Sequence, residues 1–257
     1  MTSAFDLLPP RWRADRLLRS EARAWRPIEV LGDDRGVVLV VDRSDRPTVV
    51  GRGDPAVVRA LVVDLATRRA GQPHGWMSVP RGSDPAPAVL AALGLAPFSS
   101  WDWFATAAVP DEGAGGRSVE QLDPVADAEA IRACLTAANP TSSADPGGAH
   151  ELAWFGVRED GQLLGVIGAN AQGGERPQDR SWHLHGLAVR APARRRGWGA
   201  ALTVAATRAG LGAGASWVSL GMYADNHDAR RIYERLGYRC EARFDSYGPQ
   251  GADRPPT

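Results

Sequence analysis

The sequence of 257 residues contains no lysine, and arginine alone supplies its 30 basic side chains. Asp and Glu also number 30, so the formal net charge at pH 7 is zero. Domains that bind nucleic acid usually carry a basic excess gathered on one face. The balanced charge therefore argues against nucleic acid as a partner.

Cysteine is scarce, and long apolar runs are missing. Two cysteines, Cys134 and Cys240, are too few for a disulfide framework, so we expect reduced thiols and a cytoplasmic protein. No stretch of eighteen apolar residues occurs, so we expect no membrane-spanning helix and no membrane partner. Residues 1–6 do not have the pattern of a signal peptide.

One stretch combines a short apolar strand, a connection rich in Arg and Gly, and an Ala-rich helix. Residues 183–189 predict a buried strand, and residues 200–208 favour a helix. Glycines let a ligand approach the backbone closely, and a helix start presents unpaired N–H groups and a positive dipole end. The connection therefore predicts an anion site, most simply for a phosphate or pyrophosphate.

Other interpretations of this connection stay open at this point. It lacks the Gly-Lys-Ser/Thr ending of a P-loop and the third glycine of the dinucleotide-binding fingerprint. It can also be an Arg-rich turn exposed to solvent, or a site for another polyanion. The connection alone does not separate these alternatives from a phosphate site.

Three segments, taken in order, resemble the GNAT superfamily of N-acetyltransferases. Arg194-x-x-Gly197-x-Gly199 looks like the family's acetyl-CoA pyrophosphate loop, Gln/Arg-x-x-Gly-x-Gly/Ala. His183-Leu184-His185-x-Leu187-Ala188-Val189 is similar to a strand of serotonin (arylalkylamine) N-acetyltransferases. Residues 226–238 resemble the family's Asn-x-x-Ala-x-x-x-Tyr-x-x-x-Gly-Phe segment. The resemblance covers residues 117–248.

The resemblance implies an α/β fold with a mixed, mostly antiparallel central sheet flanked by helices, and acetyl-CoA as co-substrate. It implies a primary amine as acceptor. A small amine is the first candidate, and an amino acid, an aminoglycoside-like antibiotic or a protein N-terminus stays possible. The backbone amides of Leu187, Ala188 and Val189 are implied to hold the pantetheine arm, and Asn226 and Ala229 to lie at CoA. The residues implied for the pyrophosphate are Arg194, Arg195, Arg196, Gly197, Trp198, Gly199 and Ala200.

Tyr233 is a candidate catalytic acid. A helix beginning after Asn226 places Tyr233 on the inward face, together with Ile232 and Leu236. An inward tyrosine can be a core residue with a satisfied hydroxyl. The resemblance implies a different role, in which Tyr233 protonates the departing CoA thiolate.

His183 and His185 are candidates for the general base. Two residues apart on a strand, they face the same side, and a histidine can accept a proton from an amine near neutral pH. They can instead be structural, and with no third ligand nearby we expect no metal. Strict alternation would put Leu187 and Val189 on the histidine face as well. The resemblance implies a bulge in this strand that turns the backbone toward the thioester and pantetheine. We therefore predict a bulge near residues 185–187, eased by Gly186.

The domain organisation is predicted to be two domains and a tail. Residues 1–110 alternate strand and helix and are interpreted as a non-catalytic, degenerate acetyltransferase-like domain or an unrelated α/β domain. Where a pyrophosphate loop would lie, residues 51–55 place Asp54 and Pro55 at the helix start, which disfavours phosphate. Residues 111–116 form the join, residues 117–248 the acetyltransferase domain, and residues 249–257 a flexible tail.

Two further function classes remain possible from the sequence: a non-catalytic acyl-CoA-binding sensor or regulatory module, and a protein whose arginines bind another polyanion. For the acceptor wall we expect Trp154 and the loop 139–150. The chain can be a monomer or a homodimer. Expected helices lie at residues 11–26, 54–69, 84–93, 123–138, 200–208 and 226–236; expected strands lie at 37–41, 75–79, 98–109, 118–122, 152–157, 163–169, 183–189, 217–222 and 238–247.

Overall fold

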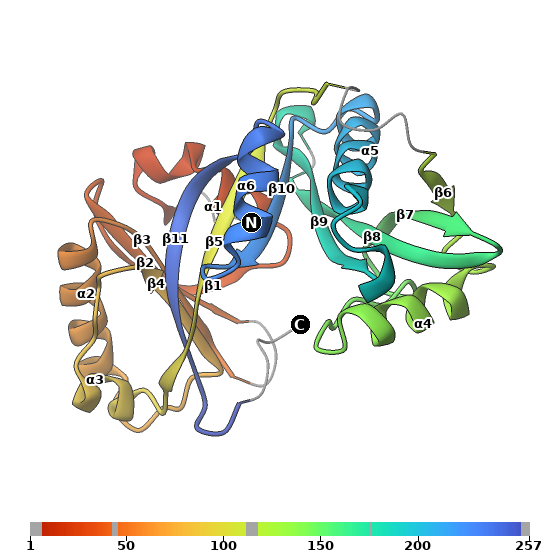
Figure 1. Cartoon of the computed structure of the whole chain (residues 1–257). Coiled ribbons are helices and arrows are strands. Elements are labelled where there is room, and N and C mark those ends of the chain that lie inside the picture. The colour runs from red at the N-terminus through yellow and green to blue at the C-terminus, as the bar shows by residue number, and fades with distance from the viewer. Residues whose placement is uncertain (1–6, 43–45, 112–117, 175, 253–257) are drawn as a thin grey trace. The chain divides into compact units, whose positions relative to one another are not determined.

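The computed structural model describes residues 7–42, 46–111, 118–174 and 176–252 (Figure 1). The chain forms two compact units. Unit 1 consists of Met1–Asp102, Tyr223–Asp225 and Ala242–Thr257, and unit 2 of Trp103–Met222 and Asn226–Glu241. The N-terminal residues 1–6, the join after Asp111 and the last five residues lie outside the described part, so the predictions made for them stay predictions.

Unit 1 is built on a sheet of strand order β1-β2-β3-β4-β11. Neighbouring strands are antiparallel except β3 and β4, which are parallel. The apolar face of α2 packs on β2, β3 and β4, with Val58, Val62 and Leu65 fully buried. The elements are η2 (Pro10–Ala14), α1 (Arg16–Ser20), β1 (Arg26–Gly32), β2 (Gly36–Asp42), β3 (Thr48–Gly53), α2 (Pro55–Arg68), β4 (Trp76–Pro80) and α3 (Pro87–Ala92).

Unit 2 has a sheet of strand order β6-β7-β8-β9-β10, in which only β9 and β10 are parallel. On opposite faces of β7, β8 and β9 lie α4 and α5 (Figure 1). This is the predicted mixed, mostly antiparallel sheet flanked by helices. The elements are β6 (Glu120–Leu122), α4 (Ala128–Ala138), β7 (Glu151–Glu159), β8 (Gln162–Gly173), η4 (Pro177–Asp179), β9 (Arg180–Val189), η5 (Ala191–Ala193), α5 (Trp198–Gly212), β10 (Trp217–Tyr223) and α6 (His227–Arg235).

Two strands divide between the units. β5 (Ala96–Thr106) passes from unit 1 to unit 2 after Asp102, and β11 (Arg239–Gly248) passes from unit 2 to unit 1 after Glu241. The two units share an order of elements: three successive antiparallel strands, a helix, a strand parallel to the third, and a second helix. The order is β1-β2-β3-α2-β4-α3 in unit 1 and β7-β8-β9-α5-β10-α6 in unit 2.

Local sequence signals predicted several elements well. The helix expected over residues 54–69 is confirmed as α2, and the Asp54 carboxylate caps it by accepting from the amides of Ala56 and Val57. A hairpin joins the expected strands β7 and β8, and Asp160 and Gly161 in its turn both have positive φ. No helix within the described residues is long and apolar enough to cross a membrane.

The helix expected over residues 11–26 is wrong. The chain instead forms η2, breaks at Asp15, continues as α1 and enters β1 at Arg26. One carboxylate oxygen of Asp15 caps α1 by accepting from the amide of Leu18 at 3.0 Å. The other lies 2.7 Å from Nη2 of Arg52 on β3, and both side chains are nearly buried. This long-range ion pair overrides the local helix propensity.

Replacement of Asp15 with Ala should lower the free energy of unfolding by about 2 kcal/mol, because the variant loses a helix cap and a charge-assisted hydrogen bond. The matched variant Asp64→Ala removes an exposed i,i+4 partner of Arg68 and should change stability by no more than about 0.5 kcal/mol. Urea unfolding at pH 7 measures both. Equal losses in the two variants would contradict the role assigned to Asp15.

Candidate active site

The strand β9 carries a bulge at the position predicted from the sequence. Val166 pairs with Ala188 but Gly168 pairs with His185, so one residue of β8 faces two residues of β9. Gly186 has a φ of +61°, a value that disfavours side chains other than glycine. A Cβ there would lie 2.8 Å from the Cβ of Ala144, so backbone conformation and packing both require glycine.

The bulge changes which residues of β9 face which helix. Leu184 belongs to the apolar cluster under α5, whereas Ala188, four residues later, belongs to the cluster under α4. His185 lies on the α4 side, with its ring edge-on to Trp154 at 5.4 Å between centroids. Leu187 packs into the α5 cluster instead. The bulge thus separates the histidine face from Leu187, which strict alternation could not do.

His185 is held by two oxygens from neighbouring strands. Its Nε2 lies 3.0 Å from Oδ1 of Asn170 on β8 and 3.2 Å from Oε1 of Glu151 on β7. The ring lies tightly on β8, because a Cβ at Gly168 would approach its Cε1 to 2.6 Å. Glycine at position 168 therefore makes room for the imidazole.

His183 has a different environment. Its Nδ1 lies 3.0 Å from Oγ of Ser219 on β10, and that hydroxyl also reaches the carbonyl of Trp182 at 3.4 Å. Burial, aided by repulsion from His185, lowers the pKa of His183 to about 4. His183 is therefore neutral at pH 7.

Tyr233 is buried on the inward face of α6, as predicted, and packs between Phe104 and Tyr238 with centroid distances of 6.2 Å and 5.9 Å. Burial raises the pKa of Tyr233 to about 12, so its hydroxyl keeps its proton at neutral pH. It lies in the same apolar cluster as Leu187.

The start of α5 is an open helix N-terminus. Gly197 occupies the N-cap position with a φ of +81°, and no side chain among the described residues caps the helix. The first turn of α5 is thus left without a side-chain cap among the described residues. The parallel pairing between β9 and β10 also ends at Leu184, before β9 itself ends at Val189.

The three arginines before α5 have different partners. Arg194 donates from Nε to the carbonyl of Val189 and from Nη2 to the carbonyl of Ala138, so its side chain holds the connection to the fold. Arg195 pairs with Asp228 at 3.1 Å and Arg196 with Glu159 at 3.2 Å. The ion pairs of Arg195 and Arg196 are exposed and can exchange for an anionic ligand at little cost.

The structure gives Asn226 a role in the fold, while its expected contact with CoA stays a prediction, and it corrects the expectation for Trp154. Asn226 caps α6 by accepting from the amide of Ala229 at 3.1 Å, so its amide oxygen is already used by the protein. Trp154 is fully buried and offers no surface to an acceptor, which corrects its expected place in the acceptor wall. The loop 139–150 does reach this region, because Ala144 lies against Gly186.

Sequence reasoning missed Glu151, Asn170 and Ser219. Strand register brings them to the histidines: Glu151 pairs with Asn170, Asn170 with His183, and Ser219 with His183. Their one sequence signal is a polar residue within or at the start of an apolar strand. No cluster of three or more His, Cys, Asp or Glu side chains in the described part of the chain could hold a metal.

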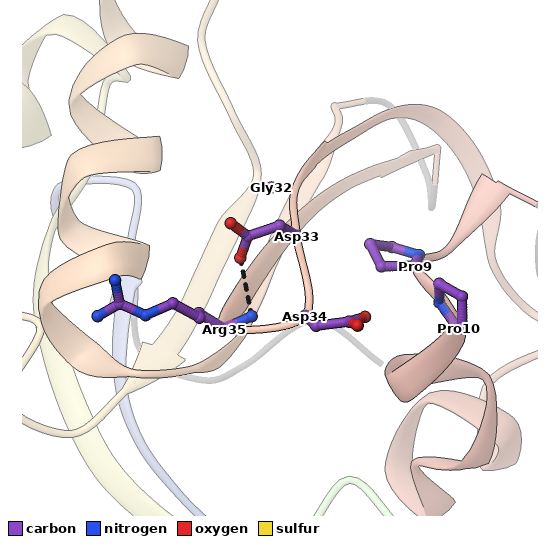
Figure 2. A pocket seen from close by; sticks show the side chains of 6 residues that line it. All are labelled: Pro9, Pro10, Gly32, Asp33, Asp34 and Arg35. Atoms are coloured by element: carbon purple, nitrogen blue, oxygen red, sulfur yellow. Dashed lines mark hydrogen bonds between the residues drawn. The ribbon is translucent and has the colours of Figure 1, made fainter.

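A pocket lies elsewhere, wholly within unit 1 (Figure 2). Its two carboxylates are engaged by their own surroundings: Asp33 accepts from the amide of Arg35 at 2.8 Å, and Asp34 from the amide of Arg11 at 3.3 Å. None of the predicted site residues lines it. Its lining consists of Pro9, Pro10, Gly32, Asp33, Asp34 and Arg35.

Comparison with known families identifies the part of the chain that carries this site. A family model described as the acetyltransferase (GNAT) family matches residues 126–238. Residues 126–238 are therefore similar to an acetyltransferase (GNAT) domain. The match includes both histidines, the α5 start and Tyr233. None of the curated proteins matches the chain.

Solved structures show the same fold over most of the chain. A GCN5-related N-acetyltransferase from Kribbella flavida is 22% identical, with 95% of this chain and 97% of that chain covered and a TM-score of 0.59. A putative GNAT acetyltransferase from Novosphingobium aromaticivorans is 20% identical, covering 83% and 88%, with a TM-score of 0.51. A tandem GNAT protein from the clavulanic acid biosynthesis pathway is 15% identical, covering 98% and 94%, also at 0.51.

The depressed pKa of His183 makes stability depend on pH. In the unfolded chain a histidine titrates near pH 6.5, whereas folded His183 stays neutral down to about pH 4. Between these values the unfolded chain binds more protons, so the free energy of unfolding should fall as pH is lowered, by up to about 3 kcal/mol.

The variant His183→Gln should lack this part of the pH dependence. Urea unfolding of both proteins at pH 7.5, 6.0 and 4.5 tests the assignment. Parallel stability curves for the two proteins would show that His183 is not held neutral by the fold.

Proposed function

We propose that the protein is an N-acetyltransferase that moves an acetyl group from acetyl-CoA directly to the primary amine of a small acceptor. One observation carries this proposal. Within the region that matches the GNAT family model, the start of α5 has no side-chain cap and follows a bulged β9 that bears two histidines. Acetyl as the acyl group, and a small amine as the acceptor, rest on the resemblance of the sequence motifs.

The donor would bind along β9 and at the start of α5. The amides of Trp198, Gly199 and Ala200 and the positive end of the helix dipole favour a pyrophosphate, and Arg195 and Arg196 add charge beside it. The end of β9 beyond Leu184 is not paired with β10, so the amides of Leu187 to Val189 can hold the pantetheine arm.

The transfer step would use a base, an oxyanion donor and an acid. A histidine of β9 takes a proton from the ammonium of the acceptor, and the neutral amine attacks the thioester carbonyl. A backbone N–H of β9 stabilises the tetrahedral oxyanion, an effect typically worth about 3 kcal/mol. The C–S bond then breaks, and Tyr233, which is neutral at pH 7, gives its proton to the CoA thiolate. The new amide nitrogen loses its remaining extra proton, and the uptake of one proton restores Tyr233.

Direct transfer is favoured over a covalent acyl-enzyme. A cysteine nucleophile must be a thiolate, and burial raises the pKa of the Cys134 thiol even though Arg190 lies beside it. Cys240 lies outside all three motif segments. An acetyl group would therefore pass from sulfur to nitrogen in a single displacement.

We also propose that residues 1–110 are a non-catalytic repeat of residues 117–248. The shared order of elements supports this interpretation, with α2 in the place of α5. The carboxylate of Asp54 accepts from the amides of Ala56 and Val57, which takes up the amides that an anion would need. We keep the expectation of a cytoplasmic protein that is a monomer or a homodimer.

A charge placed at the start of α5 tests the donor site. Acetyl-CoA should raise the thermal unfolding temperature of the wild-type protein. Gly199 has open space around its Cα, with only Leu187 at 4.0 Å from an added Cβ. Gly199→Asp should therefore fold, but its carboxylate should weaken acetyl-CoA binding about tenfold or more, equivalent to about 1.4 kcal/mol.

The control is Gly199→Asn, which has nearly the same shape without the charge and should keep most of the stabilisation by acetyl-CoA. If saturating acetyl-CoA does not stabilise the wild type, the proposed donor site is wrong. If acetyl-CoA stabilises the Asp and Asn variants equally, charge at position 199 does not explain the weaker binding.

The acid is tested by removing one oxygen atom. Tyr233→Phe should lower kcat for amine acetylation by about a hundredfold while acetyl-CoA affinity stays the same. The matched variant Tyr238→Phe removes a buried hydroxyl that bonds Thr207 at 2.6 Å, and it should lower stability while leaving kcat near that of the wild type. Thiol release measured with a panel of amines gives kcat, and unchanged kcat in Tyr233→Phe would remove the assignment.

A further inference from the structure

Glu151 is a buried carboxylate next to the candidate base. Its side chain is 9% exposed, and its Oε1 lies 3.2 Å from Nε2 of His185. Its Oε2 is fully buried and has no hydrogen-bond partner among the described residues. Apart from Asn170, the immediate surroundings of the pair include the apolar Trp154 ring.

A buried carboxylate is unfavourable unless a cation balances it. Among the described residues, the titratable groups that interact with His185 are Glu151 from β7 and His183 from its own strand. Asn170 from β8, which also contacts the ring, is neutral. No arginine in the described residues forms an ion pair with Glu151. The group that can balance the charge of Glu151 is His185, once its ring has accepted a proton.

The hydrogen bonds also orient the ring of His185. An ionised carboxylate can only accept, so Nε2 must carry the hydrogen that points to Glu151 and Asn170. The lone pair of neutral His185 is then on Nδ1. His183 differs, because its Nδ1 faces the hydroxyl of Ser219 and no ion pair with a carboxylate is formed by it among the described residues.

We propose that Glu151 is a positioning residue that makes His185, and not His183, the base for the acceptor amine. This inference rests on the proposed function. The proton moves from the acceptor ammonium to Nδ1 of His185, and the positive charge moves with it onto a ring that Glu151 faces. The amine lone pair then forms the C–N bond and the thiolate leaves, as in the transfer step above. The arrangement is that of a carboxylate behind a catalytic histidine.

The variant Glu151→Gln keeps the shape and an oxygen acceptor for Nε2–H but removes the charge. Without the carboxylate the imidazolium is less stable, so the acidic limb of the kcat/KM profile should move to lower pH by about one unit, and kcat should fall about tenfold or more. Stabilisation by acetyl-CoA should stay the same. Glu151→Asp retains the charge and should keep its acidic limb closer to that of the wild type.

Two controls separate charge from general damage. Glu120→Gln changes an exposed glutamate that pairs with Arg158 and should leave the profile unmoved. Ser219→Ala removes the partner of His183, and it too should leave the acidic limb in place. If the acidic limb of the kcat/KM profile shifts in Ser219→Ala but not in Glu151→Gln, the inference is overturned and His183 is favoured as the base.

Nitrogen NMR of the histidine rings tests the Glu151–His185 contact without the need for a catalysed reaction. In the wild type, neutral His185 should carry its hydrogen on Nε2, and in Glu151→Gln the ring should become half-protonated at a lower pH than in the wild type. Identical titration of His185 in the two proteins would overturn the inference even if the enzyme is active. Absence of acetylation by the wild type with every amine, together with the expected NMR change, would instead count against the proposed function alone.

Discussion

The single extra residue in β9 is the constraint on which the arrangement of unit 2 depends. A strand without a bulge turns residues 183, 185, 187 and 189 to one face. The bulge at Gly186 leaves His185 on the α4 side and turns Leu187 to the α5 side. The same strand can therefore present polar side chains to one layer while it completes the apolar core of the other. Only glycine fits, because φ is positive and Ala144 is close.

The helix that follows this strand shows how one side chain decides the electrostatics of a fold element. The helices α2 and α5 both follow the third of three antiparallel strands, and both begin a connection to a parallel strand. Asp54 bonds the first amides of α2, whereas Gly197 has no side chain that could cap α5. The topology thus provides the same dipole in both places, and the N-cap residue determines whether an anion can use it.

Much of this could be predicted from sequence, and the exceptions have a common cause. The bulge was predictable because the resemblance implies one in this strand, and Gly186 lies where strict alternation conflicts with the expected faces. The break at Asp15 was not, because it depends on Arg52, 37 residues away. The Glu151–His185 contact was not predictable either, because it depends on the register of β7 on β8, which itself shifts beside Glu151. Local patterns thus predicted elements and caps, while pairing between strands determined the polar partners.

The two histidines differ because strand pairing gives them different polar neighbours. They face the same layer two residues apart, so a proton on one disfavours a proton on its neighbour. Burial without a carboxylate keeps His183 neutral, and a neutral His183 spares His185 that repulsion. Glu151 lies on the side of His185 alone. The asymmetry of the pair therefore comes from strand pairing rather than from the histidines themselves, which the His-x-His sequence presents as equivalent.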